Sequence, residues 1–213
     1  LATSPDNYTL ATGSEDTTVC LWDMATGELQ NVLHGHTSHI KYITFNATGD
    51  RLATASSDHT VRIWSMPDGQ LEHVLSGHDA LCSFVAFHPN GQLMLSASED
   101  KTVRLWDTLT GELCQVLADH TQSVLYANFS SNGQWLASIS EDHKLRVWAV
   151  VPSTGTYELR HVLSEHIFKL NCAVYTPDGH SLVTGGMDMT VRVWDLNQGK
   201  ACQTFKGHTN IIT

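Results

Sequence analysis

The sequence predicts an all-β protein made of repeated four-stranded units. Five tryptophans mark the repeat, and they are separated by 42, 42, 42 and 46 residues: Trp22, Trp64, Trp106, Trp148 and Trp194. An aspartate stands six residues before each of them, and a histidine stands 22 residues before four of these aspartates. A fixed period in this range indicates a repeat architecture rather than a set of unrelated domains.

Each period contains four short β-rich runs. In the second repeat these runs cover residues 40–45, 51–56, 60–64 and 70–75. The turn between the first two runs, Ala-Thr-Gly-Asp at 47–50, recurs as 89–91, 131–133 and 177–179, with a glycine where a positive φ costs little. The first two strands should therefore form a tight hairpin. Four strands per period is the make-up of a β-propeller blade.

Short motifs within the repeats carry a family resemblance. Gly-His occurs at 35–36, 77–78 and 207–208, Trp-Asp at 22–23, 106–107 and 194–195, and Thr-Val-Arg-x-Trp at 60–64, 102–106 and 190–194. These motifs resemble WD40 repeats over the whole chain. The resemblance implies blades set radially about a central channel, with the strand after Gly-His innermost. Asp119-His120 and Glu165-His166 depart from Gly-His, and Trp64-Ser65 and Trp148-Ala149 depart from Trp-Asp, but no departure removes a strand.

The repeat phase divides the chain into blades of a single WD40 propeller region, residues 1–213. We expect a partial blade at 1–34, four complete blades at about 35–76, 77–118, 119–164 and 165–206, and the start of another repeat at 207–213. Rings of this type typically close with about seven blades, so we expect an open fragment of a larger protein. A five-bladed ring closed by the two ends is the numerical alternative. The extra residues of the 46-residue interval fall at 151–155 and predict a longer loop on the face opposite the Asp-bearing turns.

Composition restricts the partners and the compartment. Twelve Lys and Arg against 22 Asp and Glu give a formal net charge of −10, and the basic residues are scattered, so no nucleic acid is expected. No apolar stretch is long enough to span a membrane. Five cysteines, an odd number without a C-x-x-C pair, are expected to be reduced thiols of an intracellular protein, cytoplasmic or nuclear.

A His, Ser, Asp and Trp set recurs along the chain. Its residues are His36, Ser56, Asp58 and Trp64; His78, Ser98, Asp100 and Trp106; His120, Ser140, Asp142 and Trp148; His166, Asp188 and Trp194; and Ser14, Asp16 and Trp22. A nucleophile site would use these residue types once, beside an oxyanion hole. Repetition and the donor-only indole instead favour a structural role, and the set resembles the WD40 hydrogen-bond tetrad. Gly186 replaces the serine in the last full repeat, so we expect a broken chain and a locally weaker blade there.

Two other polar groups invite a functional interpretation. His34, His36 and His39 suggest zinc, but strand geometry interrupts the cluster and the tetrad uses His36, so no metal or cofactor is expected. One arginine stands two residues before each of four tryptophans: Arg62, Arg104, Arg146 and Arg192. These side chains share one strand face, and we expect them to be solvated or paired with carboxylates.

Comparing the repeats separates framework positions from variable ones. The fourth and ninth residues after each tetrad histidine are apolar, whereas the third and fifth vary, and strand alternation directs these two toward the channel mouth. The residue before each turn aspartate joins the same face. The candidate protein-binding rim comprises Glu15, His39, Lys41, Ser57, Leu81, Ser83, Glu99, Ser123, Leu125, Glu141, Lys169, Asn171 and Met187. Its glutamates favour a basic or mixed peptide, although they equally suit a turn that is simply kept soluble.

These observations predict a non-enzymatic protein-interaction scaffold, the propeller module of a larger regulatory or assembly protein. The alternative is a small-ligand or catalytic site in the central channel, which would need a single-copy convergent cluster. A repeat array attached to a separate effector domain is compatible with the scaffold hypothesis. Fold alone does not identify the partner.

Overall fold

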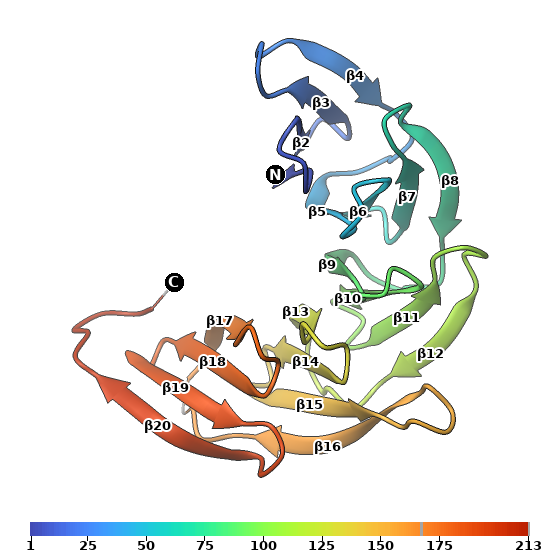
Figure 1. Ribbon diagram of the computed structural model, residues 1–213. Helices are drawn as coiled ribbons and strands as arrows, with labels where there is room; N and C mark the ends of the chain where they lie inside the picture. The colour runs from blue at the N-terminus through green and yellow to red at the C-terminus, as the bar shows by residue number, and fades with distance from the viewer. Residues whose placement is uncertain (167, 213) are drawn as a thin grey trace. The chain divides into compact units, whose positions relative to one another are not determined.

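The regular structure of the chain consists of β-strands. The computed structural model describes residues 1–166 and 168–212, and the strands within them form five four-stranded antiparallel sheets (Figure 1). Along the chain, the strands of each sheet hydrogen-bond in sequential order. The all-β fold class predicted from the repeat is therefore confirmed, and each sheet is one blade.

The blades are described here in chain order. The first contains β1 (Ala2–Thr3), β2 (Thr9–Gly13), β3 (Val19–Asp23) and β4 (Leu29–Leu33). The second contains β5 (Ile40–Phe45), β6 (Arg51–Ser56), β7 (Val61–Ser65) and β8 (Gln70–Leu75). The third contains β9 (Cys82–Phe87), β10 (Leu93–Ser98), β11 (Val103–Asp107) and β12 (Leu113–Leu117). The fourth contains β13 (Val124–Phe129), β14 (Trp135–Ser140), β15 (Leu145–Val150) and β16 (Tyr157–Leu163). The fifth contains β17 (Leu170–Tyr175), β18 (Ser181–Gly186), β19 (Thr190–Asp195) and β20 (Lys200–Lys206).

The first blade is fuller than the partial blade expected over residues 1–34. Its first strand, β1, is two residues long, and Ala2 and Thr3 pair with Ala11 and Leu10 of β2. All four strands of a blade are therefore present in this sheet.

The chain divides into two compact units, Leu1–Asp119 with three blades and His120–Thr213 with two. In the first unit the core lies between neighbouring blades. Trp64 of the second blade packs into a cluster with Ala11, Val19, Leu21 and Leu33 of the first. Trp106 of the third blade packs in the same way on Ala53, Val61, Ile63 and Leu75 of the second. Within this unit, the repeated tryptophan thus joins the second and third blades to the blade that precedes each of them.

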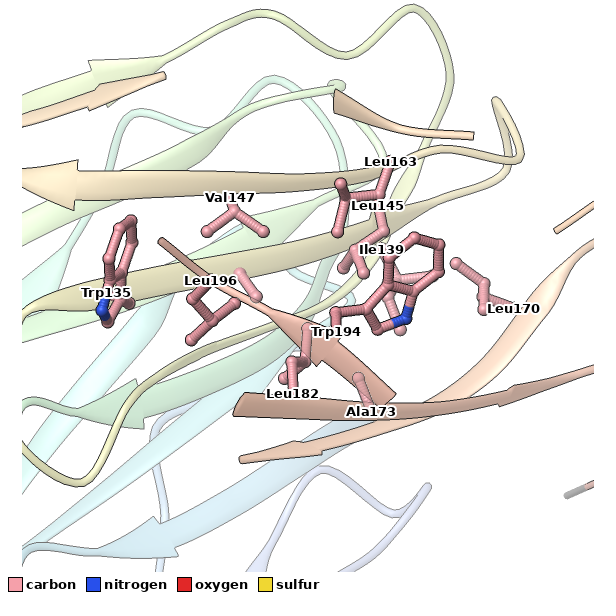
Figure 2. Packing of buried hydrophobic residues seen from close by; sticks show 11 residues of the cluster. Trp135, Ile139, Leu145, Val147, Leu163, Leu170, Ala173, Leu182, Trp194 and Leu196 are labelled. Carbon is pink, nitrogen blue, oxygen red and sulfur yellow. The ribbon is translucent and has the colours of Figure 1, made fainter. Parts of the chain in front are cut away.

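The second unit has an equivalent core. Trp194 of the fifth blade lies in a cluster with Ile139, Leu145 and Val147 of the fourth. Figure 2 shows the Trp194 ring beside Ile139 and Leu170. Burial of such aromatic and aliphatic surface is the main favourable contribution to the stability of the sheets.

A β-bulge interrupts the inner strand of four blades. In the second blade Ile40 pairs with Ser56 and Tyr42 with Ala55, so Lys41 is an extra residue in the ladder. The same shift leaves Ser83, Leu125 and Asn171 as the extra residues of β9, β13 and β17. Such a bulge bends the strand and breaks the alternation of its side chains.

The hairpin turns follow the sequence expectation. Gly91 and Gly179 adopt φ values of 73° and 69° between the first two strands of their blades, a region that favours glycine. The insertion lies where the 46-residue interval places it, because the loop between β15 and β16 covers residues 151–156. Part of its length extends the two strands, since β15 continues to Val150 and β16 has seven residues. Antiparallel topology sets this loop at the end of the blade opposite the Asp-bearing turn.

Truncation of one side chain in this core should distinguish packing from surface contributions. Leu182 is 1% exposed, so Leu182→Ala should leave a cavity and lower the free energy of unfolding by about 2–5 kcal/mol. The control, Val174→Ala on the neighbouring strand, removes a side chain from a residue that is 62% exposed and should cost about 0.5 kcal/mol or less. Urea denaturation followed by tryptophan fluorescence measures both. Equal losses would show that the two residues are packed alike.

Candidate functional site

A buried chain of hydrogen bonds crosses the second blade. His36 Nδ1 lies 2.7 Å from Asp58 Oδ2, and His36 Nε2 lies 2.7 Å from Thr54 Oγ1. The indole of Trp64 donates to the same hydroxyl oxygen at 3.0 Å. Because an ionised carboxylate only accepts, Nδ1 carries the imidazole proton and Nε2 accepts from the threonine hydroxyl. Each of these polar groups thereby has a partner.

The electrostatics of this chain favour a neutral imidazole beside an ionised carboxylate. Burial lowers the pKa of His36, and the Asp58 carboxylate only partly offsets this effect. Burial acts to raise the pKa of Asp58, but hydrogen bonds from the Thr60 hydroxyl, the Thr37 amide and His36 outweigh it and hold the pKa at about 2. Burial likewise lowers the pKa of His166 in the fifth blade.

The same chain recurs in other blades. In the third, His78 lies 2.7 Å from Asp100 and 2.7 Å from Ser96, and Trp106 donates to Ser96 at 2.8 Å. In the fifth, His166 lies 2.8 Å from Asp188 and 2.8 Å from Thr184. Trp194 donates to Thr184 at 2.8 Å. The expectation of a broken chain at Gly186 was therefore wrong.

The hydroxyl of the chain lies two residues before the predicted serine. Thr54, Ser96 and Thr184 link imidazole to indole, Ser138 meets His120, and Thr12 accepts from Trp22 at 2.8 Å. Both positions lie on the same strand face, but the indole donates to the hydroxyl at the earlier one. The predicted tetrad serines, Ser14, Ser56, Ser98 and Ser140, make other hydrogen bonds.

These serines fasten the turn and the loop after the histidine. Ser56 Oγ donates to the Ser38 carbonyl at 3.0 Å and accepts from the Asp58 amide at 3.1 Å. Ser98 and Ser140 bond in the same way to the carbonyls of Ala80 and Gln122. In the first blade Ser14 accepts from the Asp16 amide at 3.2 Å. The serine thus holds each of these turns by hydrogen bonds that are separate from those of the buried histidine.

An arginine replaces a threonine contact in the fourth blade. In the second, third and fifth blades a threonine two residues after the turn aspartate bonds to its carboxylate, but Lys144 holds that position in the fourth. Arg146 Nη1 instead donates to Asp142 Oδ2 at 2.7 Å and approaches His120, which lies 3.0 Å from Asp142. Arg104 and Arg192 lie 3.8 and 3.9 Å from their own turn aspartates. Of the two arrangements expected, solvation or pairing with a carboxylate, pairing is present for three of the four arginines.

The candidate rim contains two positions that the backbone brings together in each of four blades. The amide of the residue before the turn aspartate donates to the carbonyl of the third residue after the histidine. These pairs are Ser57 to His39 at 2.9 Å, Glu99 to Leu81 at 3.1 Å, Glu141 to Ser123 at 2.9 Å and Met187 to Lys169 at 2.9 Å. The rim predicted from repeat variation thus corresponds to neighbouring residues at the turn end of each blade.

Exposure differs along this rim. The exposed members are Glu15, His39, Lys41, Glu99, Glu141, Asn171 and Met187. The half-buried members are Ser57, Leu81, Ser83, Ser123, Leu125 and Lys169. Lys41, Ser83, Leu125 and Asn171 are the bulge residues, so the simple alternation used to orient them was wrong at this point of the strand. Asn171, for example, donates to the Ile212 carbonyl at 2.7 Å.

Ion pairs neutralise part of the rim. Glu141 of the fourth blade lies 3.6 Å from Lys169 of the fifth, and both belong to the rim. Outside the rim, Glu165 lies 3.0 Å from Arg192. Within the part of the chain that the structure describes, Glu15 and Glu99 have no ion-pair partner. Their carboxylates are therefore the rim charges available to a cationic partner.

The described residues also bear on metal binding, membrane crossing and thiol chemistry. They contain no group of three His, Cys, Asp or Glu side chains arranged to hold a metal ion, and no helix with the length and hydropathy to cross a membrane. Cys20, Cys82, Cys114, Cys172 and Cys202 are free cysteines. Burial raises the pKa of the Cys82 thiol to about 12, which makes that thiol unreactive at neutral pH.

Sequential four-stranded blades with recurrent buried His–Asp and hydroxyl–Trp contacts define a propeller-type repeat protein. The sequence pattern of the WD40 family, WD domain, G-beta repeat, matches residues 1–23, 27–65, 69–107, 111–149 and 157–195. The chain belongs to the WD40 family, as its motifs predicted.

Known relatives share short segments with the chain. Periodic tryptophan protein 2 of Arabidopsis thaliana is 42% identical over 60 residues, which are 28% of this chain and 6% of that protein. Nuclear distribution protein PAC1 of Gibberella zeae is 38% identical over 53 residues, 25% of this chain and 12% of that protein. Dynein assembly factor with WD repeat domains 1 of Xenopus laevis is 38% identical over 56 residues, 26% of this chain and 14% of that protein. The similarity thus spans less than a sixth of the length of each of these relatives.

Two serines of the third blade should differ in their contribution to stability. Ser96→Ala leaves the buried His78 Nε2 and the Trp106 N–H without their partner and should cost about 1–3 kcal/mol. Ser98→Ala removes bonds to partly exposed groups that water can replace, and about 0.5–1.5 kcal/mol is expected. Denaturant unfolding of both variants gives the comparison. A larger loss of stability from Ser98→Ala than from Ser96→Ala would indicate that Ser98, as first predicted, supplies the hydroxyl of the buried hydrogen-bond chain.

Stability should fall as the pH is lowered from 8 to 5. The folded pKa values of His36 and His166 lie below the ordinary 6.5, so their contribution is complete above 6.5 and is lost as the pH falls through the folded values. Asp58 adds a second loss at lower pH, because its contribution is complete above 3.8 and disappears as the pH falls through about 2. Urea unfolding at a series of pH values measures both phases. A stability that rises on acidification toward pH 5 would mean that the buried imidazoles are charged.

Proposed function

We propose that this chain is a non-enzymatic scaffold that binds other proteins at the turn end of its blades. The observation that carries the proposal is the division between two sets of residues in the same repeat. Histidine, aspartate, hydroxyl and tryptophan residues recur along the chain and are buried or bonded, whereas the adjoining rim side chains vary and are exposed or half-buried. A regular framework that carries a variable surface suits recognition.

The polar chain itself is unsuited to nucleophilic catalysis. The hydroxyl beside His36 belongs to Thr54, which is 0% exposed and accepts from Trp64. A substrate has no access to a hydroxyl buried between an imidazole and an indole. The WD40 family is generally non-enzymatic, and this geometry supports the same reading for the present chain.

The partner we propose is a basic or mixed peptide segment of another protein. Glu15 and Glu99 present exposed carboxylates, and the whole chain carries a formal charge of −10. Complementary charge would raise the association rate more than the final affinity. Relatives named for nuclear distribution and for dynein assembly are consistent with a module of a larger assembly protein. Free cysteines suit a reducing compartment, and we place this function in the cytoplasm or nucleus.

Neighbouring substitutions in the third blade separate framework from recognition. Asp100→Ala removes the acceptor of the buried His78 and should destabilise the chain by about 1–3 kcal/mol. Glu99→Lys alters an exposed side chain and should leave the melting temperature nearly unchanged, while reducing the association rate and affinity for a basic peptide partner.

The measurements are thermal melting and binding kinetics on immobilised chain, with peptides selected from a random library as probes. Glu99→Gln is the control that removes charge without reversing it and should have an intermediate effect. Equal destabilisation by Asp100→Ala and Glu99→Lys would make Glu99 structural. Undiminished capture of basic peptides by folded Glu99→Lys would contradict the proposed binding face.

A further inference from the structure

The turn end of the fifth blade differs in chemistry from that of the other blades. Three positions define it: the second residue after the histidine and the residues immediately before and after the turn aspartate. In the second, third and fourth blades these are Ser38, Ser57 and His59; Ala80, Glu99 and Lys101; and Gln122, Glu141 and His143. In the fifth blade they are Phe168, Met187 and Met189. Only this blade carries large apolar side chains at all three positions.

These side chains are exposed to solvent. Phe168 is 53% exposed, Met187 39% and Met189 41%. Their backbone segments are neighbours, since the Met187 amide donates to the carbonyl of Lys169, the residue after Phe168, and the Met189 amide donates to the Gly186 carbonyl. His59, at the position of Met189, is exposed although a following blade packs beside its own. Exposure at this position is therefore a property of the turn.

Two further features accompany the apolar residues. Met189 adopts a φ of 61°, a left-handed conformation that it shares with the equivalent residues His59, Lys101 and His143 of the other blades. Gly186 replaces the serine that bonds to the loop carbonyl in the second to fourth blades, and a Cβ there would lie 2.9 Å from the Lys169 carbonyl oxygen. The loop that carries Phe168 therefore lacks the serine hydrogen bond that holds the equivalent loop in those blades.

A charged cavity adjoins the apolar residues. It has a volume of about 410 Å³ and is lined by residues that include Met189, Arg192 and Lys206. Arg192 already pairs with Glu165, and the Asp188 carboxylate accepts from His166 and Thr190. Among the described residues Lys206 has no ion-pair partner. In other blades the equivalent position, two residues before the histidine, holds Ser76, Ala118 or Ser164. The ammonium group of Lys206 is therefore a cation of this cavity that a carboxylate of a partner can neutralise.

We infer that Phe168, Met187 and Met189 form an apolar docking patch for a peptide of a protein partner that presents a large apolar side chain next to a carboxylate. The apolar side chain covers the patch, where flexible methionines adapt to its shape, and the carboxylate pairs with Lys206. Contiguous exposed apolar residues with a polar border are typical of such sites. The patch belongs to the fifth blade and the Glu99 carboxylate to the third, and the inference rests on the proposed scaffold function only for the nature of its partner.

The test exchanges the patch for the residues of another blade of the same chain. The swap variant Phe168→Ser, Met187→Ser, Met189→His carries the residues of the second blade and should melt at the temperature of the parent chain. Both proteins are used to select from a phage-displayed random peptide library. Sequences recovered on the parent but lost on the swap should combine a large apolar residue with an adjacent Asp or Glu.

Affinities of a synthetic, fluorescein-labelled peptide of this type provide the quantitative measure. The swap should weaken its binding about tenfold or more, as should Lys206→Ser, which introduces the residue found at position 76. Lys206 is exposed on β20, so this single variant keeps the test valid if the swap fails to fold. Glu99→Lys should leave the binding of this peptide unchanged, and its effect on basic peptides tests the acidic rim independently.

Three outcomes would overturn the inference. The swap could lose no sequences, the lost sequences could be basic, or unchanged binding by Lys206→Ser could show that no carboxylate is recognised there. Sedimentation of the parent and the swap adds a fourth test, because self-association that the swap abolishes would identify a second copy of the chain, rather than a peptide, as the occupant.

Discussion

The second, third, fourth and fifth blades each depend on one constraint, the need to give the buried imidazole of the histidine its hydrogen-bond partners. A histidine ring removed from water needs a partner for each nitrogen, and one partner comes from the turn aspartate while the other comes from a mid-strand hydroxyl. Because that hydroxyl also accepts from the tryptophan of the next strand, one chain of bonds spans the loop, the turn and two strands. The positions of the turn residues, and hence of the rim, follow from this chain.

The sequence predicted most of this framework, because the same demands recur with the same spacing. Landmark spacing located the blades, the turns and the His–Asp pairs. It misplaced the hydroxyl because Thr54 and Ser56 lie on one face of one strand and both residue types recur. The last repeat contained the distinguishing signal, since Thr184 keeps the hydroxyl where Gly186 loses it. A position that retains a hydroxyl in all five repeats is a better candidate than one that does not.

The bulge was also encoded in the pattern. Framework positions four and nine residues after the histidine are apolar in four repeats, yet an odd separation cannot keep two residues on one face of a regular strand. An extra residue such as Lys41 must therefore lie between them. The apolar patch of the fifth blade was not evident from the rim positions, because only Met187 is one of them and Phe168 and Met189 stand at other positions of the repeat. The conformation of Met189 is a property of the folded turn that spacing does not reveal.

The tryptophan that packs on the preceding blade has a consequence for how the array unfolds. The indole of Trp64 is hydrogen-bonded within its own blade, while its ring lies among residues of the blade before it. When the first blade loses order, the Trp64 ring of the second blade therefore loses its packing surface. The hydrogen bond from that indole to Thr54 is then less protected. Nearest-neighbour coupling of this kind makes adjacent repeats melt together, as in other arrays whose stability is a sum of repeat and interface terms. A ligand that holds one blade would thus protect its neighbour from local opening, even where the two share no ligand contact.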